Sequence, residues 1–241
     1  LGMGSLRGDG LVSQSKAYEN ARGLLLDSHA HGAAGGTGES FDWQRIPDLD
    51  APVILAGGKG RRMGGRDKGL LELEGRPLIE YLLAAVSPQA GSIIINANRN
   101  QERYLSYRHR VVADTLEDFQ GPLAGFLSTM VASHSPYLVT LPCDSPYLPP
   151  DYVSRMAQAL TDQQAELAVA YDGERLQPVY ALLPCSLRAS LEAFLASGER
   201  KIDRWYALHK MAQVDFADCP GMFRNINTTE DQRRLSQEIN Q

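Results

Sequence analysis

Short apolar runs alternate with helical patterns along the chain from residue 49 onward. Runs such as Val53–Leu55 and Tyr137–Leu141 are uninterrupted, which is typical of strands buried on both faces. The segment Pro77–Val86 instead repeats its apolar residues with a helical period and has proline in its first turn. The expected strands are Val53–Leu55, Ser92–Ile95, Arg110–Ala113, Tyr137–Leu141, Leu167–Tyr171, Val179–Leu183 and Val214–Phe216. The expected helices are Pro77–Val86, Gly121–Ala132, Pro150–Leu160, Leu187–Leu195, Arg204–Met211 and Thr228–Ile239.

This alternation predicts an α/β fold in which helices cover both faces of a mostly parallel sheet. Residues 1–47 differ, because they are rich in Gly, Ala and Ser and show no sustained period. We expect them to be a poorly ordered extension that precedes one domain at residues 48–241. The pair His29 and His31 in this extension is more typical of solvated tail residues than of metal ligands.

Composition narrows the classes of partner. The 241 residues carry a formal net charge of −5, which disfavours broad attraction to nucleic acid or to anionic lipid. The three cysteines are far apart and form no CxxC pair, so a disulfide framework or structural zinc site is not expected and a reducing cytoplasm is. We expect neither a membrane span nor a signal peptide.

A glycine-rich basic segment follows the first expected strand: residues 55–68 read LAGGKGRRMGGRDK. Glycines let backbone N–H groups approach an anion closely, and the basic side chains add positive charge, so a phosphate chain is the expected ligand. The segment does not match the P-loop, because Gly64-Gly65-Arg66 interrupts that motif. It also fails the dinucleotide fingerprint, because Met63 occupies the third glycine position. A structural turn with solvated charges remains the alternative.

Polar side chains follow the next expected strands, at the edge where ligands bind in parallel sheets. They are the Asn96-Ala97-Asn98-Arg99 segment, Asp114 and Asp144. Amides at a strand end suit a base or ribose, and two carboxylates beside a basic loop suit Mg²⁺ among phosphates, although each residue alone fits a turn or a helix cap. Cys143 has no evident histidine partner, which favours packing over a nucleophilic role.

Taken together, these motifs resemble the molybdenum cofactor guanylyltransferases. The likeness spans residues 51–241 and comprises LAGG…RMG, DKGLLEL, NANR, GPLAG, PCDSPYLPP, GER…QP and NINT. It implies a three-layer α/β/α sandwich of the nucleotidyltransferase type, related to dinucleotide-binding folds. It also implies transfer of GMP from GTP to the terminal phosphate of molybdenum-bearing molybdopterin, with Mg²⁺ as the cofactor and pyrophosphate as the second product.

The resemblance also assigns residues to roles. Lys68 and Asp144 are expected to be catalytic, with Asp144 as the magnesium ligand. The expected GTP-binding residues are Leu55, Ala56, Gly57, Gly58, Arg62, Lys68, Asn96, Asp114 and Asp144. The expected acceptor-binding residues are Gly121, Pro122, Gln177, Asn225 and Asn227. Expected partners are GTP, molybdenum-molybdopterin, and proteins that deliver the cofactor or act as molybdoenzyme chaperones.

Three alternatives remain open. A related cytidylyltransferase is disfavoured because such enzymes carry LAAG, whereas Gly58 here gives a purine more room. A guanylyltransferase for a cobalamin precursor is disfavoured by Asn225-Ile226-Asn227 and by Gly121–Gly125. A nucleotide-binding regulator without turnover would need neither Lys68 nor Asp144, so both residues favour an enzyme.

Overall fold

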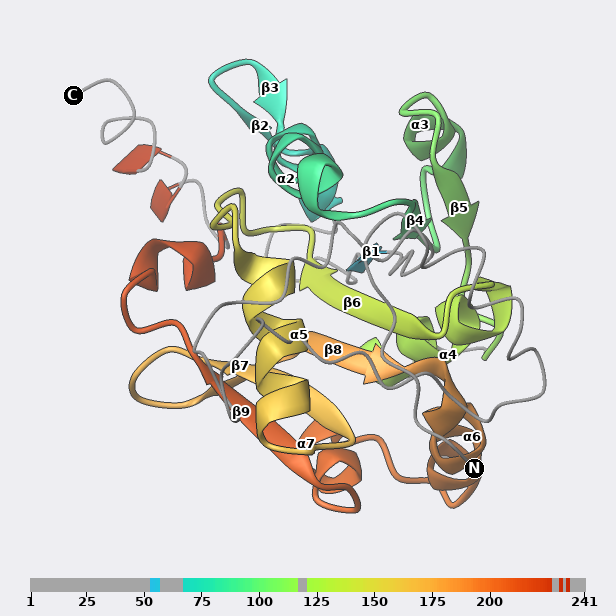
Figure 1. Cartoon of the computed structure of the whole chain (residues 1–241). Helices are drawn as coiled ribbons and strands as arrows, with labels where there is room; N and C mark the ends of the chain where they lie inside the picture. The colour runs from blue at the N-terminus through green and yellow to red at the C-terminus, as the bar shows by residue number, and fades with distance from the viewer. Residues whose placement is uncertain (1–52, 57–66, 117–120, 227–229, 232, 235–241) are drawn as a thin grey trace, which may run out of the picture. The chain divides into compact units, whose positions relative to one another are not determined.

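A seven-stranded mixed sheet forms the centre of the fold in this computed structural model, which describes residues 53–56, 67–116, 121–226, 230–231 and 233–234 (Figure 1). The strand order is β5-β4-β1-β6-β8-β7-β9. The first four of these are parallel, β8 is antiparallel to both neighbours, and β7 is parallel to β9. The strands are β1 (Val53–Ala56), β4 (Ile93–Asn96), β5 (Arg110–Val112), β6 (Tyr137–Pro142), β7 (Leu167–Tyr171), β8 (Leu176–Pro184) and β9 (Met211–Asp215).

Helices cover both faces of this sheet. The α-helices are α2 (Leu78–Val86), α3 (Gln101–Leu105), α4 (Pro122–Ala132), α5 (Tyr152–Asp162), α6 (Arg188–Ala196) and α7 (Ile202–Tyr206). Short 3-10 turns occur at η5 (Lys68–Leu70), η6 (Ser87–Gln89), η7 (Cys185–Leu187) and η8 (Pro220–Phe223). A separate hairpin pairs β2 (Glu72–Leu73) with β3 (Arg76–Pro77), and its turn residues Glu74 and Gly75 both have positive φ.

Alternate residues of β6, β7 and β8 enter two separate cores. Val139 and Leu141 of β6 pack in the core that includes α2 and α5, whereas Leu138 packs in the core that includes α4, α6 and α7. Because successive side chains of a strand point to opposite faces, this division is what a sheet between two helical layers requires. The three-layer α/β/α sandwich predicted from the sequence is therefore confirmed.

Two expected elements near the carboxyl end of the fold exist, but their predicted bounds were wrong. The helix expected at Arg204–Met211 is the shorter α7, and the strand expected at Val214–Phe216 is the earlier and longer β9. After Tyr206, backbone N–H groups bond three residues back, as in Leu208 to Trp205, so the helix tightens and ends before Met211. Neither α3 nor the β2–β3 hairpin was predicted from the sequence.

Other expectations fall at the limits of the structure. Residues 1–47, and most of the helix expected at Thr228–Ile239, lie outside the residues that the structure describes. Across the described ranges, none of the helices has the length and apolar character needed to span a membrane.

Candidate active site

Four parallel strands end in one row at the same edge of the sheet. Ala56 of β1 is in register with Asn96 of β4 and with Pro142 of β6, and Asn96 is in register with Val112 of β5. The polar residues predicted from the sequence lie at or two positions beyond this row, at Asn96, Asp114 and Asp144. The structure therefore brings these three predicted residues to one edge, as the expected parallel pairing requires.

Lys68 and Asp144 form a close ion pair at this edge. The Nζ atom of Lys68 lies 2.6 Å from Oδ2 of Asp144, and the two side chains are only 19% and 10% exposed. Asp144 lies two residues beyond the end of β6, and its carbonyl accepts a hydrogen bond of 2.9 Å from the Ile226 backbone N–H. A partly buried pair of this kind is screened less by solvent than a surface pair, so the attraction between the two side chains is stronger than at the surface.

Asp114 is held by amides instead of by a cation. Oδ1 accepts from Nδ2 of Asn96 at 3.0 Å, and Oδ2 accepts from Nδ2 of Asn98 at 2.8 Å. The Asp114 backbone N–H donates to Oδ1 of Asn98 at 2.7 Å, which closes a two-bond ring between these residues. Nδ2 of Asn96 also donates to the carbonyl oxygen of Val112 at 3.2 Å. The two carboxylates of the site therefore have different partners and different chemistry.

The start of α4 packs against this amide–carboxylate group. A Cβ atom built on Gly125 would lie 2.6 Å from Oδ1 of Asn96 and 3.6 Å from Oδ1 of Asp114. The glycine thus lets the α4 backbone approach the Asn96 side chain more closely than any other residue permits. Gly121, which has a φ of 84°, and Pro122 precede this contact and are exposed at the start of α4.

Two polar residues that were expected to bind the acceptor substrate, Gln177 and Asn225, are described. Of these, Asn225 lies beside Asp144. Oγ of Ser145 donates to Oδ1 of Asn225 at 2.5 Å, and Asn225 precedes the residue whose N–H bonds to Asp144. Gln177 donates through Nε2 to Oδ2 of Asp172 at 2.5 Å. Backbone N–H groups of Arg175 and Glu174 are the main cause that lowers the pKa of Asp172 below its usual value.

The β6–β8 pairing sets the general position of Gln177. The antiparallel register runs from Tyr137↔Pro184 to Thr140↔Ala181, so the beginning of β8 lies toward the carboxyl end of β6. Gln177 is near the beginning of β8 and Asp144 follows the end of β6, so both occupy this side of the sheet. The contacts described do not join Gln177 directly to Lys68 or Asp144.

Comparison with known proteins identifies the family. Residues 52–214 match the model of the MobA-like NTP transferase domain. A molybdenum cofactor guanylyltransferase of Shewanella sp. (strain MR-4) is 53% identical over 193 residues, which cover 80% of this chain and 98% of that protein. The chain belongs to the molybdenum cofactor guanylyltransferase family. The corresponding protein of Shewanella halifaxensis is 52% identical over 187 residues, which cover 78% of this chain and 94% of that protein.

Solved structures agree with this family at the level of fold. Molybdopterin-guanine dinucleotide biosynthesis protein A from Archaeoglobus fulgidus superposes with a TM-score of 0.66 at 23% identity, covering 79% of this chain and 98% of that chain. The 2-C-methyl-D-erythritol 4-phosphate cytidylyltransferase of Thermus thermophilus gives a TM-score of 0.60 at 17% identity, covering 80% and 100%. The chain therefore has the nucleotidyltransferase fold, and membership of this guanylyltransferase family makes it a nucleotidyltransferase enzyme.

Several site residues expected of a guanylyltransferase remain predictions. Gly57, Gly58, Arg62 and Asn227 lie outside the residues that the structure describes, and for Leu55 and Ala56 only the backbone in β1 is described. Asn98, which bonds Asp114 twice, was expected only as a member of the Asn96–Arg99 segment, and Gly125, which makes room for Asn96, was not singled out. The NANR and GPLAG motifs contain both residues, but neither motif specifies which side chain they touch.

Cys143 sits directly before Asp144 in this guanylyltransferase and is 3% exposed. Burial, together with the nearby charges of Asp144 and Asp67, raises the pKa of its thiol well above the usual value. A thiol that stays protonated is a poor nucleophile, which agrees with the packing role expected from the sequence.

Proposed function

We propose that the chain transfers GMP from GTP to the terminal phosphate of molybdenum-bearing molybdopterin, which forms the molybdopterin guanine dinucleotide and releases pyrophosphate. The observation that supports this most directly is the Lys68–Asp144 pair at the carboxyl edge of the parallel strands, in a chain of the guanylyltransferase family. A cation and a carboxylate side by side can serve a triphosphate, because the first balances its charge and the second can hold its metal.

The reaction is a single in-line substitution at the α-phosphorus of GTP. An oxygen of the pterin phosphate forms a new bond to this phosphorus while its bond to the bridging oxygen of the β-phosphate breaks. Pyrophosphate leaves with the electron pair of the broken bond, and no covalent intermediate with the protein is required. The protein then contributes positioning and charge stabilisation.

Lys68 supplies the mobile positive charge in this mechanism. Its ammonium touches Asp144, and its four-carbon stem lets it turn toward the oxygens of a bound triphosphate without movement of the backbone. There it stabilises the charge that develops on the leaving pyrophosphate. The glycine-rich segment at Gly57 and Gly58, with Arg62, is proposed to hold the β- and γ-phosphates.

Asp144 suits a magnesium ion held mainly by substrate. Mg²⁺ commonly binds one or two carboxylates and completes its shell with phosphate oxygens and water. Among the residues that the structure describes, Oδ2 of Asp144 bonds Lys68 and Oδ1 accepts no hydrogen bond, so an oxygen is available for such an ion. In the described ranges no group of three potential ligands exists. When bound, Mg²⁺ draws charge from the phosphates and makes the phosphorus more electrophilic.

The Asn96, Asn98 and Asp114 group is proposed to orient the nucleoside. Each carboxylate oxygen of Asp114 accepts one amide hydrogen, and each keeps lone-pair capacity for a further donor. Guanine N–H groups or ribose hydroxyls are donors of the required kind. The amides hold Asp114 in place before the nucleotide arrives, so little ordering accompanies binding.

The acceptor is proposed to bind on the side of Asp144 that carries Asn225. Because Oδ1 of Asn225 accepts from Ser145, its Nδ2 group is left to donate to an anion such as the pterin phosphate. Gly121, Pro122, Gln177 and Asn227 are the further acceptor residues of this proposal. Proteins that deliver the pterin or receive the product are expected as partners.

The reaction is proposed to occur in the cytoplasm. The three free cysteines, Cys143, Cys185 and Cys219, support a reducing compartment. No role is proposed for nucleic acid or for a membrane.

A product assay tests the function. The purified protein is incubated with Mg²⁺, molybdenum-molybdopterin and each of GTP, CTP, ATP and UTP, and products are identified by mass spectrometry. We expect the guanine dinucleotide with one pyrophosphate released per product, and no product when the metal is chelated. Preferential use of CTP, or hydrolysis of GTP without transfer, would overturn the proposal.

A further inference from the structure

A second carboxylate lies next to Lys68 in sequence, and α3 holds it. Oη of Tyr104 donates to Oδ1 of Asp67 at 2.5 Å, and Nδ2 of Asn100 donates to Oδ2 of Asp67 at 3.0 Å. Both oxygens of Asp67 are thus occupied by donors that are 37 and 33 positions away along the chain. We call these three residues the Asp67 clamp.

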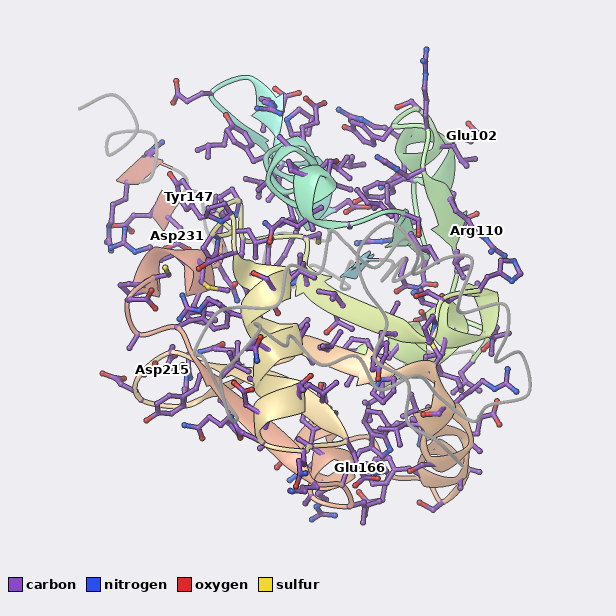
Figure 2. All side chains as sticks on the ribbon, viewed as in Figure 1. Glu102, Arg110, Tyr147, Glu166, Asp215 and Asp231 are labelled. Carbon is purple, nitrogen blue, oxygen red and sulfur yellow. The ribbon has the colours of Figure 1, made fainter. Side chains whose placement is uncertain are left out.

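The clamp is built into the fold. Tyr104 is 2% exposed, whereas Glu102 of the same short helix is exposed on the outer side of α3, as Figure 2 shows. Burial is the main cause that raises the pKa of the Tyr104 phenol above its usual value, so the hydroxyl keeps its proton and donates it to the carboxylate. Asn100 begins α3 with a φ of 51°, a conformation that asparagine tolerates better than most residues.

The main chain connects the clamp to Lys68. The Asp67 carbonyl accepts from the Leu70 N–H at 3.2 Å, which starts the 3-10 turn that carries Lys68. A Cβ atom on Gly69 would lie 2.7 Å from Oη of Tyr104 and 3.4 Å from Cβ of Cys143. The turn is therefore packed between α3 on one side and the end of β6 on the other. From this turn, the side chain of Lys68 extends to Asp144.

The clamp also separates two competing carboxylates. Asp67 and Asp144 both lie close enough to the buried Cys143 thiol to raise its pKa, so the two acids occupy the same neighbourhood. An unclamped Asp67 would offer a second anionic partner to the Lys68 ammonium or to a cation bound at Asp144. Two hydrogen bonds on its oxygens direct it toward α3 instead.

From this geometry we propose that Asn100 and Tyr104 are positioning residues for GMP transfer. They hold Asp67 so that Lys68 faces Asp144, and they keep Asp67 from competing for Lys68 or for the metal. The proposal rests on the function proposed above, since its main readout is the rate of that reaction. Neither residue needs to touch a substrate.

The first test compares Tyr104→Phe with Tyr107→Phe. Both changes remove one phenolic oxygen from the same segment, but the Tyr107 hydroxyl interacts with Glu80 of α2 and not with Asp67. We expect Tyr104→Phe to lower kcat by about 10-fold or more, because small displacements of a charge-stabilising group are costly in the transition state. KM for GTP should change less than kcat. The Mg²⁺ concentration for half-maximal rate should shift on the order of 10-fold, as when an outer-shell partner of a metal ligand is lost.

The second test exchanges the two groups of the Asp67–Asn100 contact. Asp67→Asn alone places two amides against each other, and Asn100→Asp alone places two carboxylates against each other. The double variant restores a donor opposite an acceptor and leaves a carbonyl oxygen to accept from Tyr104. We expect the double variant to be several-fold more active than either single variant, which general destabilisation would not produce.

The outcomes separate the two proposals. Rates and half-saturating Mg²⁺ concentrations for Tyr104→Phe within twofold of those for Tyr107→Phe would overturn the clamp, as would a double variant no better than its singles. If the parent protein does not make the guanine dinucleotide, the proposed function fails instead. Calorimetric titration of parent and variants with GTP at several Mg²⁺ concentrations then still tests the clamp, since an identical Mg²⁺ dependence of GTP binding would contradict it. Thermal unfolding confirms that each variant is folded.

Discussion

Gly125→Ala tests how tightly the packing around Asn96 and Asp114, the proposed nucleoside side of the site, is built. The added Cβ would lie 2.6 Å from Oδ1 and 3.2 Å from Cγ of Asn96, well inside the roughly 3.5 Å at which carbon contacts become favourable. Asn96 is 3% exposed and is tied by Nδ2 to Asp114 and to the Val112 carbonyl, so it cannot simply swing into solvent. Either α4 or the Asn96 side chain must shift.

The expected change in the free energy of unfolding combines two opposing contributions. Forcing an extra methyl group into a packed interior costs about 1–3 kcal/mol. Alanine is favoured over glycine within a helix by about 1 kcal/mol, which offsets part of that cost. We therefore expect a net loss of about 1 kcal/mol in the free energy of unfolding, which lowers Tm by roughly 2–4 °C for a domain of this size.

The effect on GTP should exceed the effect on stability. If Asn96 yields, Asp114 loses a hydrogen bond to a charged group, worth about 1.5–3 kcal/mol. Half of that loss, expressed in nucleotide binding, raises KM for GTP by about 3- to 10-fold, since 1.4 kcal/mol corresponds to a factor of ten. The assay is steady-state kinetics with varied GTP, beside thermal unfolding.

Gly221→Ala is the matched control for this variant. A Cβ there meets nothing within 4 Å, and the residue does not have positive φ, so parent-like stability and kinetics are expected. A Gly125→Ala protein that is more stable than the parent and keeps its KM for GTP would refute the reasoning. It would mean that α4 moves at little cost and that Asn96 is not confined by it.

Three further outcomes are expected. Asp144→Asn, which keeps the shape but removes the charge that Lys68 faces, should lower turnover by about 10²–10³-fold in a folded protein, as measured by initial rates; a near-parent rate would remove this carboxylate from the mechanism. Iodoacetamide at pH 8 should modify the partly exposed Cys219 before the buried Cys143, whose raised pKa keeps it protonated, and peptide mass spectrometry would detect the opposite order. A chain that begins at residue 48 should keep the parent Tm and rate, and a fall of several degrees would contradict the proposed domain boundary.

Strand positions were predictable because burial on both faces leaves a direct mark on the sequence. The uninterrupted runs at β1, β4, β6 and β7 all coincide with the expected strands to within a residue at each end. Prediction from apolar runs fails where the elements are short and half-exposed. Trp205 and Tyr206 are buried, and the apolar spacing continues to Met211, yet the backbone between them tightens and turns into β9. Spacing alone does not distinguish a long helix from a turn followed by a strand.

The residues of the candidate site could be predicted from the sequence, but the hydrogen bonds and ion pairs between them could not. The rule that ligands bind beyond the carboxyl ends of parallel strands selected Asn96, Asp114 and Asp144, and the structure places all three at one edge. The rule does not say that Asp114 takes two amides while Asp144 takes the ammonium of Lys68. Those choices depend on packing between segments that are distant in sequence, for which a single sequence carries no period or motif.

Two glycines of the site act through the space that they leave. In the sequence, glycines near a strand end indicate backbone that can turn and approach a phosphate closely. Gly69 and Gly125 do not have positive φ; instead, an absent side chain admits Oη of Tyr104 at the first and Oδ1 of Asn96 at the second. Each admitted atom then bonds or borders a carboxylate, Asp67 at the first glycine and Asp114 at the second. Because backbone atoms close these contacts, the polar groups are fixed before substrate binds, which is the condition under which charges stabilise a transition state most effectively.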